Sequence, residues 1–289
     1  MHRKVSILVV FTLLLTLAGS LWAKSTVKEK FHQEVSGAGI AEFHLSNVNG
    51  SVDMEASSSD MVIIDAFKEV KGPDEDECQK ILKELTIDVK NSENRISVKT
   101  KQMKNLFRYN YSVTYKVKVP ARMRLEVGTT NGNVTCIKNE GGADIESTNG
   151  TLEFIECKGE LFGGTTNGNI DVRNCSGKVE AETTNGSVIV KGDIRSVKSS
   201  TTNGNVEIDC NPDANGKVIA ETTNGSIELS LPKTASAHVT AETSNGKIDV
   251  DGFTLQLNKK RTSAIGTIGS GTGKIELETT NGGIDIIAK

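Results

Sequence analysis

The feature that most constrains this chain is a tetrapeptide that returns at a fixed spacing. Thr-Thr-Asn-Gly, or a Ser variant of it, occurs eight times from residue 129 onward. The first four steps between its asparagines are 18 residues each, two steps of 21 follow, and the last step is 36. A fixed period of this kind is typical of chains that stack one structural unit. The repeated turn dipeptides are Asn131-Gly132, Asn149-Gly150, Asn167-Gly168, Asn185-Gly186, Asn203-Gly204, Asn224-Gly225, Asn245-Gly246 and Asn281-Gly282.

Apolar and polar residues alternate between these tetrapeptides. The second and fourth positions after Asn-Gly are aliphatic, as in Val188 and Val190. The other half of the repeat carries smaller residues, as in Val179, Ala181 and Thr183. Alternation with period two predicts half-buried strands, and Asn-Gly supplies the positive φ of a tight turn. We therefore expect a thin interior in which an aliphatic wall faces a wall of Ala, Thr and Gly.

Two architectures can use this pattern, an antiparallel meander of hairpins or a parallel solenoid with two strands per coil. The constant period favours the solenoid, because stacking places each Asn on the next, about 4.7 Å away, where the amides can form a ladder. The composition agrees, since 28 Gly with only 4 Pro excludes a Pro-rich disordered chain and collagen. The low aromatic content, 4%, fits a thin interior.

Two regions break the rhythm of the repeat. The 21-residue steps predict extra turn residues at 211–213 and 231–233, where two of the prolines lie. Between Asn245 and Asn281 the motif is absent. We expect a longer loop at 253–261 and a degenerate coil at 266–273.

The first 23 residues have the pattern of a secretory signal peptide. A short basic head precedes an apolar run at 5–17, and small residues follow up to Ala23. The run is short for a membrane span, so we expect cleavage and no membrane span in the mature chain. Removal of Arg3 and Lys4 would shift the net charge from -3 to about -5. The protein is therefore predicted to be exported, and a periplasmic, cell-surface or secreted location stays open.

Residues 24–127 lack the period and are predicted to form a β-rich cap with one helix. One isolated copy of the turn and strand occurs at 47–52. A helix is expected at 74–85, with Asp74 as its N-cap and Cys78, Ile81, Leu82 and Leu85 on one face. The predicted organisation is a signal peptide at 1–23, the cap at 24–127 and the solenoid at 128–289. The fold class is all-β.

These features together resemble the bacterial putative-adhesin family, a domain of unknown function in exported proteins. The resemblance rests on the copy at 47–52, the acidic helix, the strand at 115–120, the repeated tetrapeptide and the closing segment 269–284. It implies a right-handed β-solenoid outside the cytoplasm and no known catalytic residues. The adhesin label describes the architecture of the family, so it implies binding only in general terms.

A search for catalytic or metal-binding residues yields little. The histidines outside the signal peptide, His32, His44 and His238, have no nucleophile motif beside them. The carboxylates recur with the repeat, which is typical of a solvated face rather than an active site. A calcium site along Glu182, Glu221 and Glu242 is disfavoured because Gly164 and Ser200 interrupt the column. We expect no catalytic residue, no metal and no cofactor.

Two further segments remain as candidates. Cys157 and Cys175 are 18 residues apart and should stack on neighbouring coils, within the range a disulfide allows. Free buried thiols are the alternative, and Cys136 and Cys210 are expected to lie out of phase with this column. The basic segment 99–108 could contact a ligand or a membrane, although a solvated hairpin loop is favoured.

The sequence thus favours a non-enzymatic exported β-solenoid that acts as an adhesin or an envelope interaction protein. Its partner would be a protein or glycan of the cell envelope, met by the flat outer faces of the coils. A periplasmic sensor or regulatory accessory that binds a membrane protein is the alternative, and a carbohydrate-active enzyme is a third. Nucleic acid is not expected, because the net charge is -3 and no segment carries a long run of one sign of charge. The oligomeric state stays open.

Overall fold

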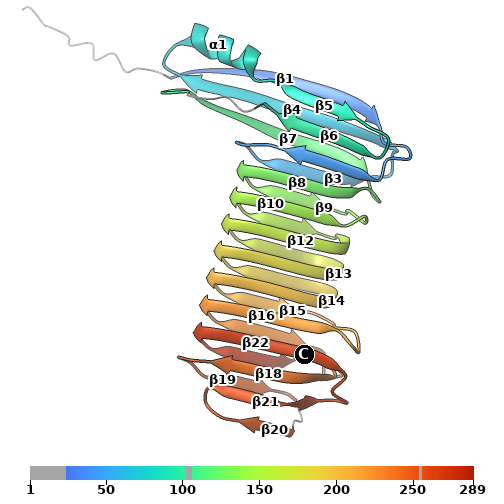
Figure 1. The fold of residues 1–289 in the computed structure, drawn as a ribbon, viewed down its shortest axis with the longest axis vertical. Coiled ribbons are helices and arrows are strands. Elements are labelled where there is room, and N and C mark those ends of the chain that lie inside the picture. The colour runs from blue at the N-terminus through green and yellow to red at the C-terminus, as the bar shows by residue number, and fades with distance from the viewer. Residues whose placement is uncertain (1–23, 102–105, 254–255) are drawn as a thin grey trace, which may run out of the picture.

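The computed structural model describes residues 24–101, 106–253 and 256–289, and the predicted signal peptide lies outside them. Within these residues 23 strands join in one sheet, together with one helix, so the all-β prediction is confirmed. Figure 1 shows the strands stacked along the long axis, with the helix at the N-terminal end. No helix of the described residues is long and apolar enough to cross a membrane.

One side of the stack is formed by strands that end in the repeated tetrapeptide, and we call it the Thr wall. These strands pair in parallel along the stack. In spatial order they are β2 (Glu42–Ser46), β8 (Arg124–Asn131), β10 (Ala143–Asn149), β12 (Lys158–Asn167), the second halves of β13 (Ile170–Asn185) and β14 (Val188–Asn203), β16 (Lys217–Asn224), β22 (Gly273–Asn281) and β18 (Ala237–Thr243).

The strands that follow each Asn-Gly form the opposite wall, also by parallel pairing. In the same order they are β3 (Val52–Ser57), β9 (Val134–Ile137), β11 (Leu152–Ile155), the first halves of β13 and β14, β15 (Val206–Asp209), β17 (Ile227–Leu231), β23 (Ile284–Ala288) and β19 (Ile248–Asp251). In the regular part of the stack a residue pairs with its counterpart 18 positions on, as Leu152 pairs with Ile170. The parallel stacking predicted from the period is therefore confirmed.

The interior lies between the two walls and is as thin as the sequence predicted. Val188 and Val190 of the opposite wall are buried, as are Val179 and Ala181 of the Thr wall. The first Thr of each tetrapeptide also points inward and is buried, as at Thr183. Small residues on one side and aliphatic residues on the other thus fill a narrow core.

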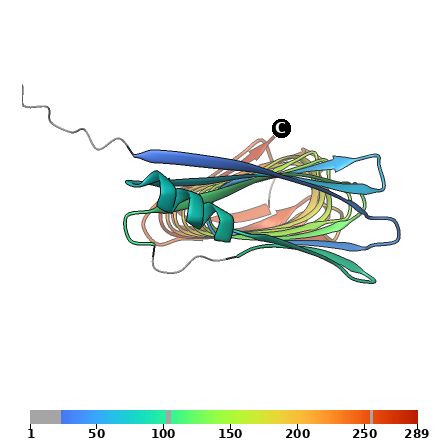
Figure 2. The same ribbon diagram turned by 90° about the horizontal axis from the view of Figure 1, so that it is seen from above.

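The N-terminal cap adds antiparallel strands and the helix to the end of the stack. On the Thr wall β6 (Arg95–Thr100) pairs in parallel with β2, and β5 (Ile87–Asn91) pairs antiparallel with β6. On the opposite wall β7 (Asn110–Pro120) pairs with β3, then β4 (Met61–Gly72) with β7, and β1 (Ser25–Ser36) with β4. The helix α1 (Glu75–Glu84) lies across the end of the flattened stack, as the view from above shows (Figure 2).

The predicted helix is confirmed in position and in the residues that hold it. Asp74 is the N-cap, and its carboxylate accepts a 2.8 Å hydrogen bond from the Glu77 amide. The apolar face predicted from the spacing is buried. At the other end, the Nζ atom of the buried Lys68 donates to the carbonyl of Leu85 at 3.1 Å. This ammonium satisfies a carbonyl that a helix end leaves without an intrahelical partner.

The boundary predicted between residues 127 and 128 does not correspond to a break in the structure. It falls inside β8, and the copy of the motif at 47–52 is not isolated, because β2 and β3 stack directly on β8 and β9. The cap therefore supplies the first repeat of the stack. Periodicity detected the repeats at regular spacing and missed this one, which a long insertion separates from the others.

The order of the last repeats also differs from the prediction. Stacking in chain order would place Asn245 on Asn224, but Asn281 pairs with Asn224 instead. The repeat at 273–288 thus lies between those at 217–231 and 237–251. Residues 266–273 do not form a degenerate coil, because β21 (Ser263–Ile268) is antiparallel to β18, with β20 (Gln256–Lys259) antiparallel to β21.

Candidate functional site

The repeated asparagines form the predicted amide ladder at the corner between the two walls. Each side-chain amide donates to the preceding Asn, for example from Asn185 to Asn167 at 2.9 Å. The ladder begins at Asn49 and continues in spatial order through Asn131, Asn149, Asn167, Asn185, Asn203, Asn224, Asn281 and Asn245. These side chains are exposed but bonded to one another, so the corner holds the repeats together.

The glycine after each Asn is required for a reason that the sequence did not reveal. Positive φ was expected, but none of these eight glycines lies in the left-handed region. A Cβ on Gly168 would instead lie 2.0 Å from the carbonyl oxygen of Gly150 in the preceding repeat. The same oxygen accepts a 3.1 Å hydrogen bond from the buried Thr165 hydroxyl. The glycines are therefore selected by close backbone contact between repeats.

A groove runs along the outer surface of the Thr wall, beside this corner. Its volume is about 1350 Å³, and it extends from the ends of β5 and β6 across β2, β8, β10, β12 and β13 to Ser200 of β14. One side is the row of outward threonines of the tetrapeptides, at positions 130, 148, 166 and 184. The groove is thus built on strands that the repeat fixes, and it presents hydroxyl groups at regular intervals.

The floor of the groove exists because the repeat is interrupted there. One column of paired outward residues on the Thr wall consists of Lys99, Ser46, Gly128, Glu146, Gly164, Glu182, Ser200, Glu221, Glu278 and Glu242. Glycines alternate with Glu146 and Glu182 in the upper half, so side chains are missing at two levels. In the lower half three glutamates follow one another. The interruption of this column of glutamates, which argued against a calcium site, leaves the space that forms the groove.

Phe162 adds an aromatic surface at the centre of the groove. Among the described residues of the Thr wall, it is the one Phe, Tyr or Trp side chain that points outward. A Cβ on Gly164 would lie 3.3 Å from its ring, and a Cβ on Gly163 would lie 3.0 Å from the ring of the buried Phe154. The two neighbouring glycines therefore make room for two rings, one outside the wall and one inside.

Charged side chains of both signs line the groove. Lys99, Lys101 and Asp88 lie at the cap end, whereas Glu146 and Glu182 lie further along the stack. Glu182 receives a 2.9 Å hydrogen bond from the ammonium of Lys198, which lies on the next strand. The lysines of the lining thus lie at the cap end alone, and hydroxyls separate them from the two glutamates.

A buried polar network fixes the cap strands at the upper end of the groove. The amide of Asn47 donates to the Val113 carbonyl at 2.8 Å, and its oxygen accepts from the Thr100 hydroxyl at 3.0 Å. Thr100 lies 2.7 Å from the Tyr115 hydroxyl. Burial raises the pKa of Tyr115 to about 12. The network carries no charge at neutral pH and holds β6 and β7 against the first repeat.

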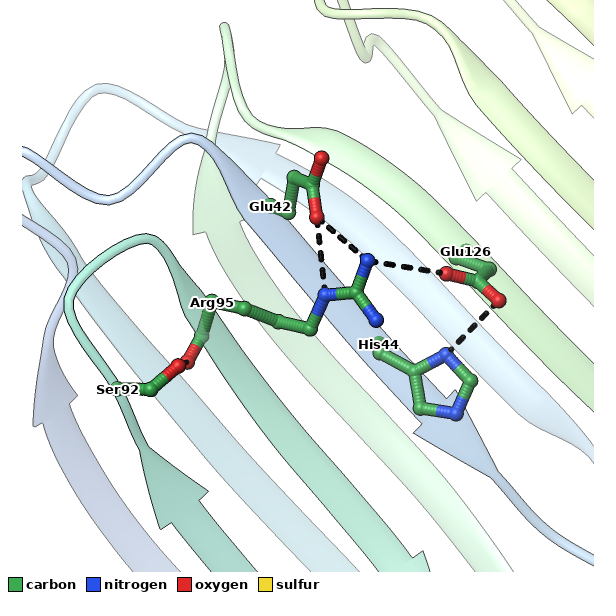
Figure 3. A network of polar contacts seen from close by, with 5 residues as sticks. All are labelled: Glu42, His44, Ser92, Arg95 and Glu126. Carbon is green, nitrogen blue, oxygen red and sulfur yellow. Dashed lines mark hydrogen bonds and ion pairs between the residues drawn. The ribbon is translucent and has the colours of Figure 1, made fainter.

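An exposed network reinforces the same junction on the outer surface (Figure 3). Arg95 donates to Glu42 at 2.7 and 2.9 Å and lies 3.8 Å from Glu126, which faces His44 at 3.3 Å. Ser92 donates to the backbone carbonyl of Arg95 and not to the imidazole. The carboxylate of Glu126 can orient the imidazole of His44, but a carboxylate is not a nucleophile that this imidazole would activate. The network joins β6, β2 and β8 and shows no arrangement for nucleophilic catalysis.

The structure changes the grouping of the cysteines. The Sγ atom of Cys157 lies 3.6 Å from the Sγ atom of Cys136, although Cys136 was expected to be out of phase. The backbone amide of Cys157 lies 3.2 Å from the Sγ atom of Cys175. Cys210 directly follows β15, and its amide donates to the Ser230 carbonyl at 3.3 Å. All five cysteines of the chain are buried free thiols. A bond between Cys157 and Cys175 stays a prediction, and Cys136 is a competing partner.

The remaining candidates are placed apart from one another. His32 and His238 lie on β1 and β18, at opposite ends of the stack. The sequence predicted that Glu221 and Glu242 are neighbours in an interrupted column. In the structure Glu278 lies between them. Among the described residues, no group of three His, Cys, Asp or Glu side chains has the geometry to hold a metal ion. The basic segment 99–108 is described only at its two ends, 99–101 and 106–108.

Comparison with known proteins identifies the family. The model of the Toastrack family, DUF4097, matches residues 40–287, so the chain belongs to this family of unknown function. No curated protein matches it. The expected membership of a domain family of unknown function is thereby confirmed.

Solved structures with low sequence identity resemble the chain over most of its length. A putative adhesin from Bacteroides fragilis NCTC 9343 is 13% identical, with a TM-score of 0.47 and coverage of 89% of this chain and 97% of that one. A putative adhesin from Parabacteroides distasonis ATCC 8503 is 12% identical, with a TM-score of 0.41 and the same coverages. A putative lipid binding protein from the same strain is 12% identical, with a TM-score of 0.35 and coverage of 90% and 97%.

Proposed function

We propose that the protein is an exported, non-enzymatic binding protein of the cell envelope and that the groove of the Thr wall binds a glycan. The observation that supports this most is local. Phe162, Gly128 and Gly164 depart from the repeat at the place where the groove lies. Departures from a repeat that the fold does not need are where a binding function is expected. The proposal includes a right-handed solenoid with two strands per coil and export by the predicted signal peptide.

The lining of the groove suits a ligand rich in hydroxyl groups. Carboxylates at Glu146 and Glu182 accept hydrogen bonds, and the threonine hydroxyls both donate and accept. The half-buried ring of Phe162 offers an apolar face among these polar groups. A sugar has the same combination, with hydroxyls at its rim and C–H groups on its faces.

The shape of the groove favours an extended chain over a compact ligand. Its hydroxyl row follows the stacking of the strands, so like groups recur about every 4.8 Å. A polymer with regularly spaced hydroxyls can therefore repeat one contact along several strands. The groups are held on paired strands, so little ordering is required on binding.

Electrostatics distinguish a neutral or mixed-charge glycan from a polyphosphate. Lys99 and Lys101 could pair with an anionic group at the cap end. Further along, Glu146 and Glu182 would repel a uniformly anionic chain. A glycan that is neutral, or that carries an anionic group near one end of the groove, fits this distribution.

The proposal is tested by binding of the purified mature chain to isolated cell-wall glycan and to soluble envelope polysaccharides. Replacing Phe162→Ala should weaken binding about tenfold or more, because a central aromatic contact commonly carries this much of the affinity. The matched control is Ile219→Ala, which lies in the same outward column below the groove and should bind as the unchanged chain. Retention on no glycan, or equal binding by both variants, would contradict the proposal.

The same experiment separates the alternatives. Release of sugar products that is lost in Glu146→Gln or Glu182→Gln would show a carbohydrate-active enzyme and contradict the non-enzymatic role. Capture of one membrane protein in stoichiometric amount, without glycan binding, would favour a periplasmic sensor or regulatory accessory. The adhesin role requires in addition that a deletion strain loses surface attachment.

A further inference from the structure

The last repeat of the chain is inserted into the stack rather than added to its end. β22 lies between β16 and β18, and β23 lies between β17 and β19, as Figure 1 shows for β22. On the Thr wall Asn224 pairs with Asn281, and Thr279 of the same strand pairs with Thr243. Residues 273–289, which we call the inserted segment, therefore separate two repeats that are consecutive in the sequence.

The chain reaches this position by crossing over the start of β18. Ile268 and Gly273 both pair with Ala237, from opposite sides. Residues 269–272 therefore form a hinge that passes over Ser236, the residue before Ala237. The Ser236 hydroxyl lies 2.7 Å from the Ser270 hydroxyl and accepts a 2.9 Å hydrogen bond from its amide. The hinge contains two glycines with positive φ, at 269 and 271. It is short and rich in glycine, and its hydrogen bonds join Ser270 and Thr272 to the Ser236 hydroxyl and the Gly271 amide to the Ile268 carbonyl.

The repeat below the inserted segment depends on it for its attachment to the stack. On the side of this repeat that faces the rest of the stack, β18 pairs with β22 and β19 pairs with β23. Ile275, Leu277, Ile284 and Ile286 of the inserted segment are buried between the neighbouring repeats. Removing the segment would leave two parallel edges facing each other, and we call the space between them the slot.

The slot cannot distinguish its own segment from the same segment of a second copy. The inward pattern is Val-Ala-Thr on β16 and β18 and Ile-Leu-Thr on β22, so the inserted strand differs from its two neighbours in the side chains that it buries. A second copy offers the same side chains and the same ladder amide. The hinge alone therefore determines which copy of the segment fills the slot.

We propose that two copies of the protein exchange their inserted segments and form a dimer in which each slot holds the segment of the other copy. All contacts of the segment are kept in the exchange, and only the hinge changes conformation. A four-residue hinge can extend over about 13 Å, which suffices to leave β18 in the outward direction. A dimer of this kind would carry two grooves, although the inference does not depend on their ligand.

Site-specific cross-linking tests the exchange in the full mature chain. Glu221 and Glu278 are exposed partners on adjacent strands across the slot, at a spacing suited to a disulfide. One tagged copy carries Glu221→Cys, the other carries Glu278→Cys, and the two are expressed together. Exchange predicts a covalent dimer of the two tags on a non-reducing gel, and light scattering should show a dimer fraction that rises with protein concentration.

Two controls make the result decisive. The double variant Glu221→Cys with Glu278→Cys should close within one chain at low concentration, which shows that the slot is correctly filled. Glu182→Cys paired with Glu278→Cys should not cross-link, because β14 and β16 separate their strands. The proposal is overturned if the double variant closes internally while mixed copies give no covalent dimer at any concentration.

Discussion

The corner of the Thr wall and the outer face beside it are built from the same strands, yet they differ in what repeats. At the corner each repeat presents Asn to the ladder and Gly to the backbone contact. On the face, one column alternates between Gly and Glu in its upper half and is continuous in Glu in its lower half. The comparison teaches that the repeated residues hold the stack together, whereas the departures shape its surface. Corner substitutions should therefore change stability, and face substitutions should change binding.

The largest effect is expected at a corner glycine. Gly168→Ala places a methyl group 2.0 Å from the Gly150 carbonyl oxygen, so two repeats must move apart. We expect a loss of about 3 kcal/mol or more in the free energy of unfolding, measured by denaturant titration. Gly128→Ala on the face is the control, because its methyl would meet no atom within 4 Å. Similar losses in both variants would break the distinction between corner and face.

The junction of cap and stack is expected to respond to alkaline pH. The pKa of Tyr115 is raised to about 12, whereas an unfolded tyrosine has a pKa near 10. Its contribution to stability is therefore complete below pH 10 and is lost as pH rises from about 10 to about 12, by about 2 to 3 kcal/mol. Unfolding of the unchanged chain and of Tyr115→Phe across this range should show a loss that is smaller by this amount in the variant, because buried groups such as Cys210 titrate in both. Parallel pH profiles would contradict the buried network.

Completing the column on the face should remove the groove at a small cost to the stack. Gly164→Glu would put a third carboxylate between Glu146 and Glu182, where the ring of Phe162 now lies against the glycine. We expect glycan binding to weaken at least tenfold, while the free energy of unfolding falls by about 1 kcal/mol because like charges then face each other across the strands. Binding isotherms and denaturant titration on the same sample measure both. A stability loss as large as that of Gly168→Ala would show that the face also supports the fold.

The smallest effect is expected for one member of the amide ladder. Asn185→Ala removes the hydrogen bonds to Asn167 and from Asn203, both 2.9 Å long and exposed. Water can replace part of what is lost, so we expect a loss of about 1 kcal/mol with unchanged glycan binding. Thermal unfolding and the binding isotherm would show this. A binding defect would mean that the ladder itself contacts the ligand.

The period of the sequence predicted the fold of each repeat but not the order of the repeats. The spacing of Asn131, Asn149 and Asn167 requires parallel stacking, and the structure has it. Past residue 231 the strands keep the same alternation and the same Asn-Gly turn, so the pattern does not reveal that Asn281 precedes Asn245 in space. The hinge over Ser236 decides this, and its glycines and serines carry no periodic signal.

The candidate site was only half visible in the sequence. Gly164 was noticed as a gap in a column of glutamates, and Phe162 was not singled out. That the two residues together shape the groove follows only from the register of the strands. The register places Gly164 between Glu146 and Glu182, and the ring of Phe162 lies over the gap. A search for residues that break the repeat on the outward positions would have found the groove. The role of Gly168 was likewise misjudged, because contact between backbones leaves no trace in local turn preferences.

Hydrogen exchange with and without bound glycan would test the central claim most directly. The account predicts that glycan slows exchange in β8, β10, β12 and β13 of the Thr wall, along the groove. Exchange in β16, β22 and β18 should stay unchanged, although these strands share the corner and the ladder. Protection that spread evenly along the whole stack, or that appeared only on the opposite wall, would contradict a ligand site made by the departures from the repeat.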